Sequence, residues 1–307
     1  MRVPNISLAN DLVDRLDVLR GRQNQLNQQL ATGQRISLAS EDPQAASRVM
    51  MLRSEMSTTQ QYARNMDAAT SIAETVGTGL TRLNDISDRA GELITLAASP
   101  TASASDKSSY AVEMNQLLMQ AMDAANSQFN GQYVFNGINI TSAPFSAVVN
   151  APDSAEHPTS IAAASSVAVG ANGLSIQVTD SLTISPYSTG SNNVAISTFI
   201  NNLQSARDAM EGRAGAPSLS TATANLKTSE NAIVNAVAEN ASLRGRFESI
   251  RSAAEQRFTD ITGLISRETD VDLAQTMVNL SKNQTAYQAA MQAGAQILRL
   301  SLLDYIR

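Results

Sequence analysis

Residues 40–100 read SEDPQAASRVMMLRSEMSTTQQYARNMDAATSIAETVGTGLTRLNDISDRAGELITLAASP, and no other part of the chain constrains the architecture as strongly. Asp42 can accept hydrogen bonds from the free N–H groups of a helix that begins at Pro43. Apolar residues then recur at helical spacing until Ser99 and Pro100. The pattern predicts a helix of about 55 residues and roughly 80 Å. A helix of that length indicates an elongated, mainly α protein.

Three more interior segments carry the helical period. Residues 110–129 are expected to form a helix that packs back antiparallel on the long one, and residues 196–210 are expected to form another short helix. Residues 219–265 follow as a second long rod. The expected architecture is therefore a set of long antiparallel helical rods.

Between the rods the period changes to that of short strands. Asn-Gly pairs between such strands are typical of type I′ hairpin turns. The predicted strand pairs are 132–135 with 138–141 across Asn136-Gly137, and 167–169 with 174–178 across Asn172-Gly173. The surrounding residues are mostly small or polar, so we expect a small inserted β subdomain with a loose core.

The two ends of the chain carry narrow apolar stripes whose spacing alternates between four and three residues, as in a coiled coil. Burying about five Leu side chains contributes on the order of 10 kcal/mol, and ordering about 25 residues costs at least as much in backbone entropy. Alone, such a segment is therefore expected to be largely unfolded. The matching stripes at the two ends predict a coiled coil between them, and the unsatisfied apolar stripes require a partner. The alternative is an ordinary surface helix. The residues assigned to this assembly interface are Leu12, Leu16, Leu19, Leu26, Leu30, Leu273, Met277, Leu280, Tyr287, Met291, Leu300 and Leu303.

These patterns predict the order of segments along the chain. The expected segments are an N-terminal axial assembly segment at 1–43, a first half of the helical rod at 44–137, an outer β subdomain at 138–192, a second half of the rod at 193–269, and a C-terminal axial assembly segment at 270–307.

Composition excludes several classes of function. Hydrophobic residues make up 43% of the 307 residues but aromatic residues only 4%, a mixture that favours helix bundles over a compact enzyme core. The net charge of -6 gives no electrostatic footprint for a nucleic acid or an anionic membrane, so neither partner is expected. The absence of cysteine excludes disulfides and thiolate sites.

Residues with catalytic or metal-binding chemistry are sparse. His157 is the only histidine, so a multi-histidine metal site is excluded by count, and we interpret it as an exposed loop residue. The carboxylates near the N-terminus and at 270–272 are better explained by a solvated helix face and a helix cap than by a metal site. The chain is therefore not expected to be an enzyme or to hold a cofactor or metal.

Two motifs resemble signatures of a known family, the flagellins and the hook-associated proteins related to them. Near the N-terminus the motif is LATGQRI at 30–36 followed by ASEDPQAA at 39–46, with Glu41 in place of the usual Asp. Near the C-terminus it is DVDLA at 270–274, NLS at 279–281 and QTAYQA at 284–289. The ending ILRLSLLDYIR at 297–307, with YVFNG at 133–137 and TSAPF at 141–145, is more similar to family members that join hook to filament than to filament flagellins.

The resemblance implies a structural subunit of the bacterial flagellum, located outside the cell. It implies assembly into a ring, contacts with a neighbouring hook-associated protein and with flagellin, and a flagellar export chaperone that holds the C-terminal segment. Export through the flagellar type III apparatus is also implied. It agrees with a start that reaches Asn10 and Asp11 before any apolar run long enough for a cleaved signal peptide.

Two other interpretations stay open at this point. A filament flagellin proper would polymerise alone into long filaments. A helical signalling or binding module would have ordered ends as an isolated monomer and would not leave the cell by the flagellar route.

Overall fold

The computed structural model describes residues 4–149, 153, 157–168 and 175–305, with side chains described only between residues 10 and 296. Its helices are α1 (Pro4–Thr32), α2 (Pro43–Ala97), α3 (Ala104–Ala125), α4 (Gly190–Glu211), α5 (Leu219–Thr269) and α6 (Leu273–Tyr305). The prediction of a mainly α fold is confirmed. None of the described helices is long and apolar enough to cross a lipid bilayer.

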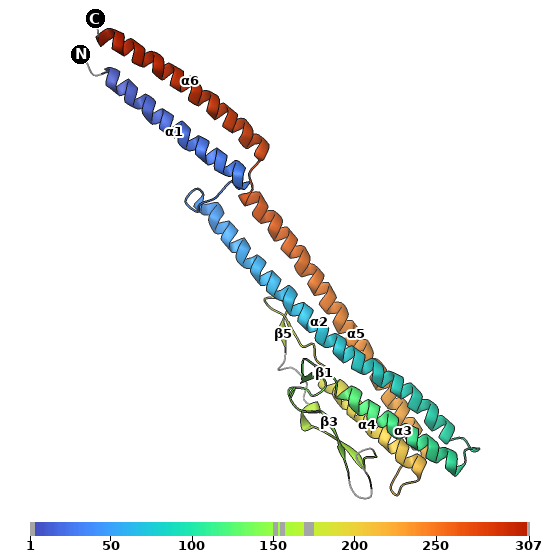
Figure 1. Cartoon of the computed structure of the whole chain (residues 1–307). Coiled ribbons are helices and arrows are strands. Elements are labelled where there is room, and N and C mark those ends of the chain that lie inside the picture. Colours follow the sequence, from blue (N-terminus) through green and yellow to red (C-terminus); the bar gives the residue numbers. More distant parts are fainter. Residues whose placement is uncertain (1–3, 150–152, 154–156, 169–174, 306–307) are drawn as a thin grey trace. The chain divides into compact units, whose positions relative to one another are not determined.

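The chain divides into two compact units. Unit 1 comprises residues 1–58 and 257–307, and unit 2 comprises residues 59–256. In unit 1, α1 and α6 run antiparallel and lie side by side (Figure 1). Helix α1 ends at Thr32 because Gly33 takes a positive φ of 70°, and its N–H donates to the Gln29 carbonyl.

The start of α2 follows the sequence prediction. The Asp42 carboxylate accepts a hydrogen bond of 3.0 Å from the Ala45 N–H, which confirms it as a capping group. This backbone hydrogen bond is the largest cause that holds the pKa of Asp42 below its ordinary value, and a hydrogen bond from the Arg35 side chain lowers the pKa further. The helix extends to Ala97 without interruption, as its unbroken apolar spacing predicts.

Unit 2 is built around one large apolar core. After α2 the chain reverses at a turn (Figure 1). Ser103 and Asp106 cap α3 reciprocally. Helices α3 and α4 lie close together, and Arg89 of α2 is paired with Glu113 of α3 at 2.7 Å. The core collects buried residues from all four helices of the unit, among them Leu83, Leu93, Met114, Leu118, Phe199, Leu203 and Ile233.

The first predicted hairpin is wrong by six residues. The antiparallel pair is β1 (Gln128–Phe129) with β2 (Gln132–Tyr133), and the turn is Asn130-Gly131, both with positive φ. Residues 138–141 form no strand. The Asn-Gly pair at 136–137 cannot be the tip of a hairpin because Asn136 is fully buried. Its side-chain amide donates a hydrogen bond to the Ser142 carbonyl and accepts one from the Ser166 hydroxyl.

The second predicted hairpin is also wrong in its pairing. Val167 lies in a 3₁₀ turn, η1 (Ser165–Ala168), and β5 (Ile176–Gln177) pairs with β6 (Thr183–Ile184). The predicted turn at Asn172-Gly173 lies outside the described residues. A further antiparallel pair, β3 (Phe145–Val148) with β4 (Ser160–Ala163), was not predicted.

The inserted strands contribute more to the core than their composition predicts. Phe145 and Ile161 are buried with the main core of unit 2. Val178 and Ile184, beside the β5–β6 hairpin, form a second cluster with Met66 of α2 and Phe247 of α5. The insertion therefore packs its few large side chains against the helices.

Candidate assembly site in the terminal segments

The two sequence motifs meet in unit 1, where the connection from α1 to α2 lies beside the connection from α5 to α6. The Arg35 N–H donates to the Thr269 carbonyl at 2.6 Å, and the Val271 N–H donates to the Gly33 carbonyl at 3.0 Å. Gln34 and Asp270 form an antiparallel bridge. This clasp, residues 33–35 with 269–271, joins the N-terminal and C-terminal segments through the backbone.

Charged side chains in and beside the two motifs reinforce the clasp. Arg48 donates two hydrogen bonds to the Glu268 carboxylate, at 3.0 and 2.9 Å, and this pairing is the main reason that the pKa of Glu268 lies below its ordinary value. Arg35 donates to the Glu268 carbonyl at 2.9 Å and pairs with Asp42 at 3.4 Å. The N–H groups of Ser37 and Leu38 bind the Glu41 carboxylate and lower its pKa. The Glu41 of the motif is thus a loop-closing acceptor.

The N-terminal stripe faces α6. Leu26 is buried, and the other leucines assigned to the stripe are half-buried, namely Leu12, Leu16, Leu19 and Leu30. The Asn283 side chain donates a 2.9 Å hydrogen bond to the Leu19 carbonyl. Leu12 lies against Gly294, where an added Cβ would be 2.5 Å from Leu12 Cδ2. The leucine stripe of α1 is therefore the surface on which α6 packs.

The C-terminal stripe faces α1 only in part. Leu280 and Tyr287 are half-buried, but Leu273, Met277 and Met291 are 48%, 60% and 51% exposed. Leu300 and Leu303 lie outside the described side chains. Small or polar residues complete the contact with α1. Asn283 and Gly294 lie against α1, and Thr276 is buried on the same side of α6.

Sequence reasoning missed these three residues because it followed large apolar side chains. Their signal is the seven-residue repeat itself. Thr276 and Asn283 are seven residues apart, and Leu280, Tyr287 and Gly294 follow one another at the same interval. Together these five residues form a second seam on α6, beside the predicted one. Helix α6 thus carries a paired seam against α1 and an adjacent apolar stripe of Leu273, Met277 and Met291 that is exposed. We call the latter the open stripe.

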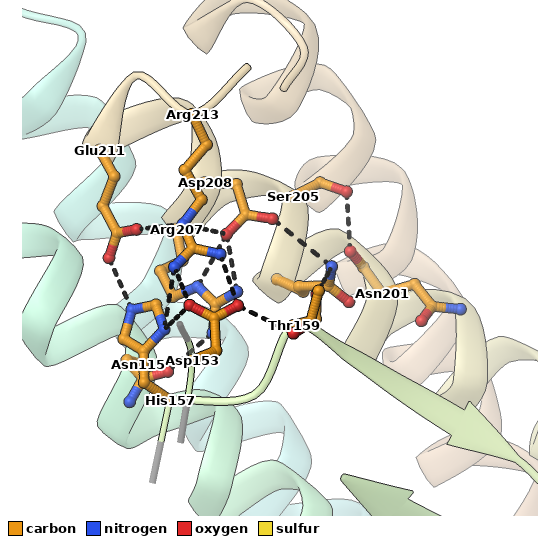
Figure 2. Close-up of polar contacts among 11 residues, drawn as sticks. Asn115, Asp153, His157, Thr159, Asn201, Ser205, Arg207, Asp208, Glu211 and Arg213 are labelled. Carbon is orange, nitrogen blue, oxygen red and sulfur yellow. Dashed lines mark hydrogen bonds and ion pairs between the residues drawn. The ribbon is translucent and has the colours of Figure 1, made fainter. Parts of the chain in front are cut away.

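Unit 2 contains a separate polar cluster, shown in Figure 2, which includes the only histidine. Asp153 accepts from Arg213 at 2.6 and 3.1 Å and from Thr159 at 2.8 Å, and these bonds, Arg213 first, lower the pKa of Asp153 to about 2. His157 Nε2 lies 2.8 Å from a Glu211 oxygen. The loop at His157 is therefore held against the end of α4.

The cluster has the character of a structural latch. Arg207, fully buried, donates to Asp208 at 2.9 and 2.7 Å and to Asn115 at 2.9 Å, so its charge is compensated. Among the residues that the structure describes, no group of three or more histidine, cysteine, aspartate or glutamate side chains could hold a metal ion.

Sequence comparisons point to one set of relatives. Residues 14–140 match the family model of the bacterial flagellin N-terminal helical region. The chain is 27% identical over 291 residues to flagellar hook-associated protein 3 of Escherichia coli (strain K12), covering 90% of each chain. It is 26% identical over 294 residues to flagellar hook-associated protein 3 of Salmonella typhimurium, covering 92% of each chain.

Solved structures share the fold at low sequence identity. A Vibrio parahaemolyticus protein regarded as a flagellar hook-associated protein aligns with a TM-score of 0.62 at 13% identity, covering 75% of this chain and 100% of that one. The FlgL protein of Bacillus cereus aligns with a TM-score of 0.54 at 16% identity, covering 70% and 99%. These likenesses concern the fold alone.

Proposed function

We propose that this chain, a member of the flagellin-like proteins that include hook-associated protein 3, is a structural subunit of the bacterial flagellum that joins the hook to the filament. The observation that carries the proposal is the similarity to two hook-associated proteins over nine-tenths of both chains. A match confined to the N-terminal helical region would suit any flagellin. Similarity over the whole length favours the junction role over that of a filament flagellin.

The terminal helices are the proposed means of assembly. The α1–α6 pair leaves the open stripe of Leu273, Met277 and Met291 exposed on one side of α6. Fully burying each such side chain contributes about 1.5 to 3 kcal/mol. We propose that neighbouring subunits cover the open stripe, so that residues 1–43 and 270–307 become the axial part of a ring.

The partners follow from the position in the flagellum. The ring would contact a neighbouring hook-associated protein on one side and flagellin on the other. The subunit would be exported by the flagellar type III route with a chaperone on its C-terminal segment, and it would act outside the cell. A structural role requires no catalytic site, so the chain would not be an enzyme.

The direct test is immuno-electron microscopy of purified flagella and hook–basal bodies. Label should lie at the outer end of the hook, and a strain that lacks the protein should make hooks without filaments while releasing flagellin into the medium. Label along the whole filament would identify a filament flagellin instead. Label that stays inside the cell would exclude a flagellar role.

A further inference from the structure

Unit 1 has a groove between α2 and α5, with a volume of about 460 Å³. Met51 and Leu52 of α2 and Leu264 of α5 form its apolar lining. Met51 is 63% exposed and Leu264 is 39% exposed, so apolar surface faces solvent here. The groove is separate from the α1–α6 seam and from the open stripe.

The charges around the groove do not all cancel. Arg48 is paired with Glu268, and Glu55 is paired with Arg257. Arg267 also lines the groove, and no ion pair of Arg267 occurs among the residues that the structure describes. The groove therefore presents apolar side chains beside one uncompensated cation, which suits a partner with an apolar side chain next to a carboxylate.

The outer face of α1 has this chemistry. Val18 is 70% exposed, more than any other large apolar side chain in the described part of the chain. Asp14 and Asp17 are on the same face at helical spacing, and neither has an ion pair among the described residues. Gly21 follows one turn later, and a Cβ added there would meet nothing within 4 Å. No side chain covers the helix backbone at this point, and the space beside it is open. We call these four residues the outer strip.

The outer strip lies away from the leucine stripe that meets α6. At about 3.6 residues per turn, Asp14, Asp17, Val18 and Gly21 cover the side of α1 opposite that stripe. The arginines of this part of the helix fall outside the strip by the same spacing, namely Arg15, Arg20 and Arg22. Pairing of α1 with α6 therefore leaves the outer strip accessible.

A ring of identical subunits needs two different complementary surfaces on each subunit. A head-to-tail contact joins unlike patches, whereas one self-complementary patch gives only a two-fold dimer. The outer strip and the groove are such a pair, because one is apolar with carboxylates and the other is apolar with a free cation.

We propose that the groove between α2 and α5 receives the outer strip of α1 from a second copy of this chain, an inference that rests on the proposed assembly into a ring. Val18 enters between Met51 and Leu264 of the neighbouring copy. Asp14 or Asp17 then lies beside Arg267, and Gly21 lets the backbones approach closely. Charge complementarity fixes the direction of the contact more than its strength.

The natural absence of cysteine allows a direct cross-linking test. Val18→Cys and Met51→Cys are placed together in one full-length chain, which is produced in cells that lack the native protein. Hook–filament junctions are isolated, treated with a mild oxidant and analysed by non-reducing electrophoresis. Because each subunit contacts the next, disulfides between Val18→Cys and Met51→Cys should give a ladder of covalent oligomers.

The matched control is Val18→Cys with Met50→Cys. Met50 is 65% exposed, nearly the same as Met51, but it does not line the groove. This control should give no ladder. Equal ladders from both pairs, or a disulfide confined to single chains in the Met51→Cys protein, would overturn the inference.

A charge exchange tests the polar half of the contact. Arg267→Glu alone and Asp14→Arg with Asp17→Arg should each reduce the number of subunits that stay on isolated hooks, and the combined variant should recover it. The pairing is contradicted if Arg267→Glu or the Asp14→Arg, Asp17→Arg variant keeps the native number of subunits on the hooks. It is also contradicted if the combined variant does not recover that number. If the native protein labels the hook end while these cross-linking and exchange tests fail, the groove assignment is wrong and the junction role stands; if it is absent from the hook, the proposed function itself fails.

Discussion

Gly294 of α6 is directly opposite Leu12 of α1, so closely that a Cβ added at Gly294 would lie 2.5 Å from Leu12 Cδ2. Real atoms do not approach that closely, so any side chain at position 294 forces Leu12 or the helix to move. The glycine therefore leaves room for the Leu12 methyl group against α6.

The first prediction is that Gly294→Ala loosens the α1–α6 pair. Alanine favours a helix by about 1 kcal/mol over glycine, so an isolated α6 would gain helicity, whereas overpacking costs about 1 to 3 kcal/mol. We expect faster hydrogen exchange of α1 amides near Leu12. The matched change is Gly263→Ala in α5, where a Cβ meets nothing within 4 Å, and no amide of α1 should exchange faster. Unchanged exchange in Gly294→Ala would mean that Leu12 adapts freely.

The second prediction separates assembly from folding on α6. Met277 is in the open stripe and 60% exposed, so Met277→Asp should leave the melting temperature of the monomer unchanged. In the assembly it would bury an unpaired carboxylate, at a cost of several kcal/mol per subunit. Cells carrying the variant should lose swimming and release flagellin into the medium.

Val278→Asp is the control for that variant. Val278 is the next residue, is 48% exposed, and lies on another side of α6. It should permit swimming. Leu26→Asp should differ from both, because Leu26 is buried within the monomer and its replacement should already unfold the α1–α6 pair. Normal swimming of Met277→Asp would remove the open stripe from the interface.

The third prediction concerns the insertion. Ile184 is buried against α2 and α5 in the cluster with Met66 and Phe247, so Ile184→Ala should destabilise unit 2. We expect a loss of about 2 to 4 kcal/mol by urea unfolding, from the lost transfer free energy and the cavity. Leu182, two residues earlier and 38% exposed, is the control, and Leu182→Ala should change stability by less than about 0.5 kcal/mol.

The same cluster alters the expected effect of deleting residues 138–192. Its composition, with few large apolar residues, suggests that the segment is dispensable for joining the hook to the filament. Its removal would also uncover Met66 and Phe247, which Val178 and Ile184 cover in the intact chain. We therefore expect the deletion variant to melt earlier than the full chain, and an unchanged melting temperature would show that the β5–β6 hairpin adds nothing to stability.

The fourth prediction is a pH dependence from the latch at Asp153. Its pKa is lowered from 3.8 to about 2 in the folded chain, chiefly by hydrogen bonds from Arg213. The folded state thus favours the carboxylate. The contribution to stability is complete above about pH 4 and is lost as the pH falls through 2. Asp153→Asn should destabilise the protein at pH 7, with a difference from the native protein that shrinks towards pH 2.

Urea unfolding at pH 7 and near pH 2 measures this difference. Asp88→Asn, a change at an exposed carboxylate of α2, should show no comparable loss at pH 7. A difference for Asp153→Asn that is the same at both pH values would show that the charge of Asp153 is not what stabilises the latch.

The chain itself determined its helices, because helix signals are local. Asp42 and Pro43 start α2, the apolar period carries it to Ala97, and Gly33 ends α1 through a backbone angle that glycine adopts readily. The motifs at 30–46 and 270–289 likewise carried the family resemblance. Each of these features depends on residues within a few turns of one another.

The tertiary structure decided what those elements touch. Two Asn-Gly pairs lie six residues apart, and local propensity cannot choose between them. The burial of Asn136, with partners at Ser142 and Ser166, leaves the hairpin to Asn130-Gly131. On α6 the large apolar residues suggested one seam, but close approach of two helices favours small residues, so Gly294 and Asn283 face α1 and Met277 stays exposed. The side of α6 that is buried depends on which surface of α1 packs against it. Since α1 and α6 are at opposite ends of the chain, only the folded structure specifies that contact.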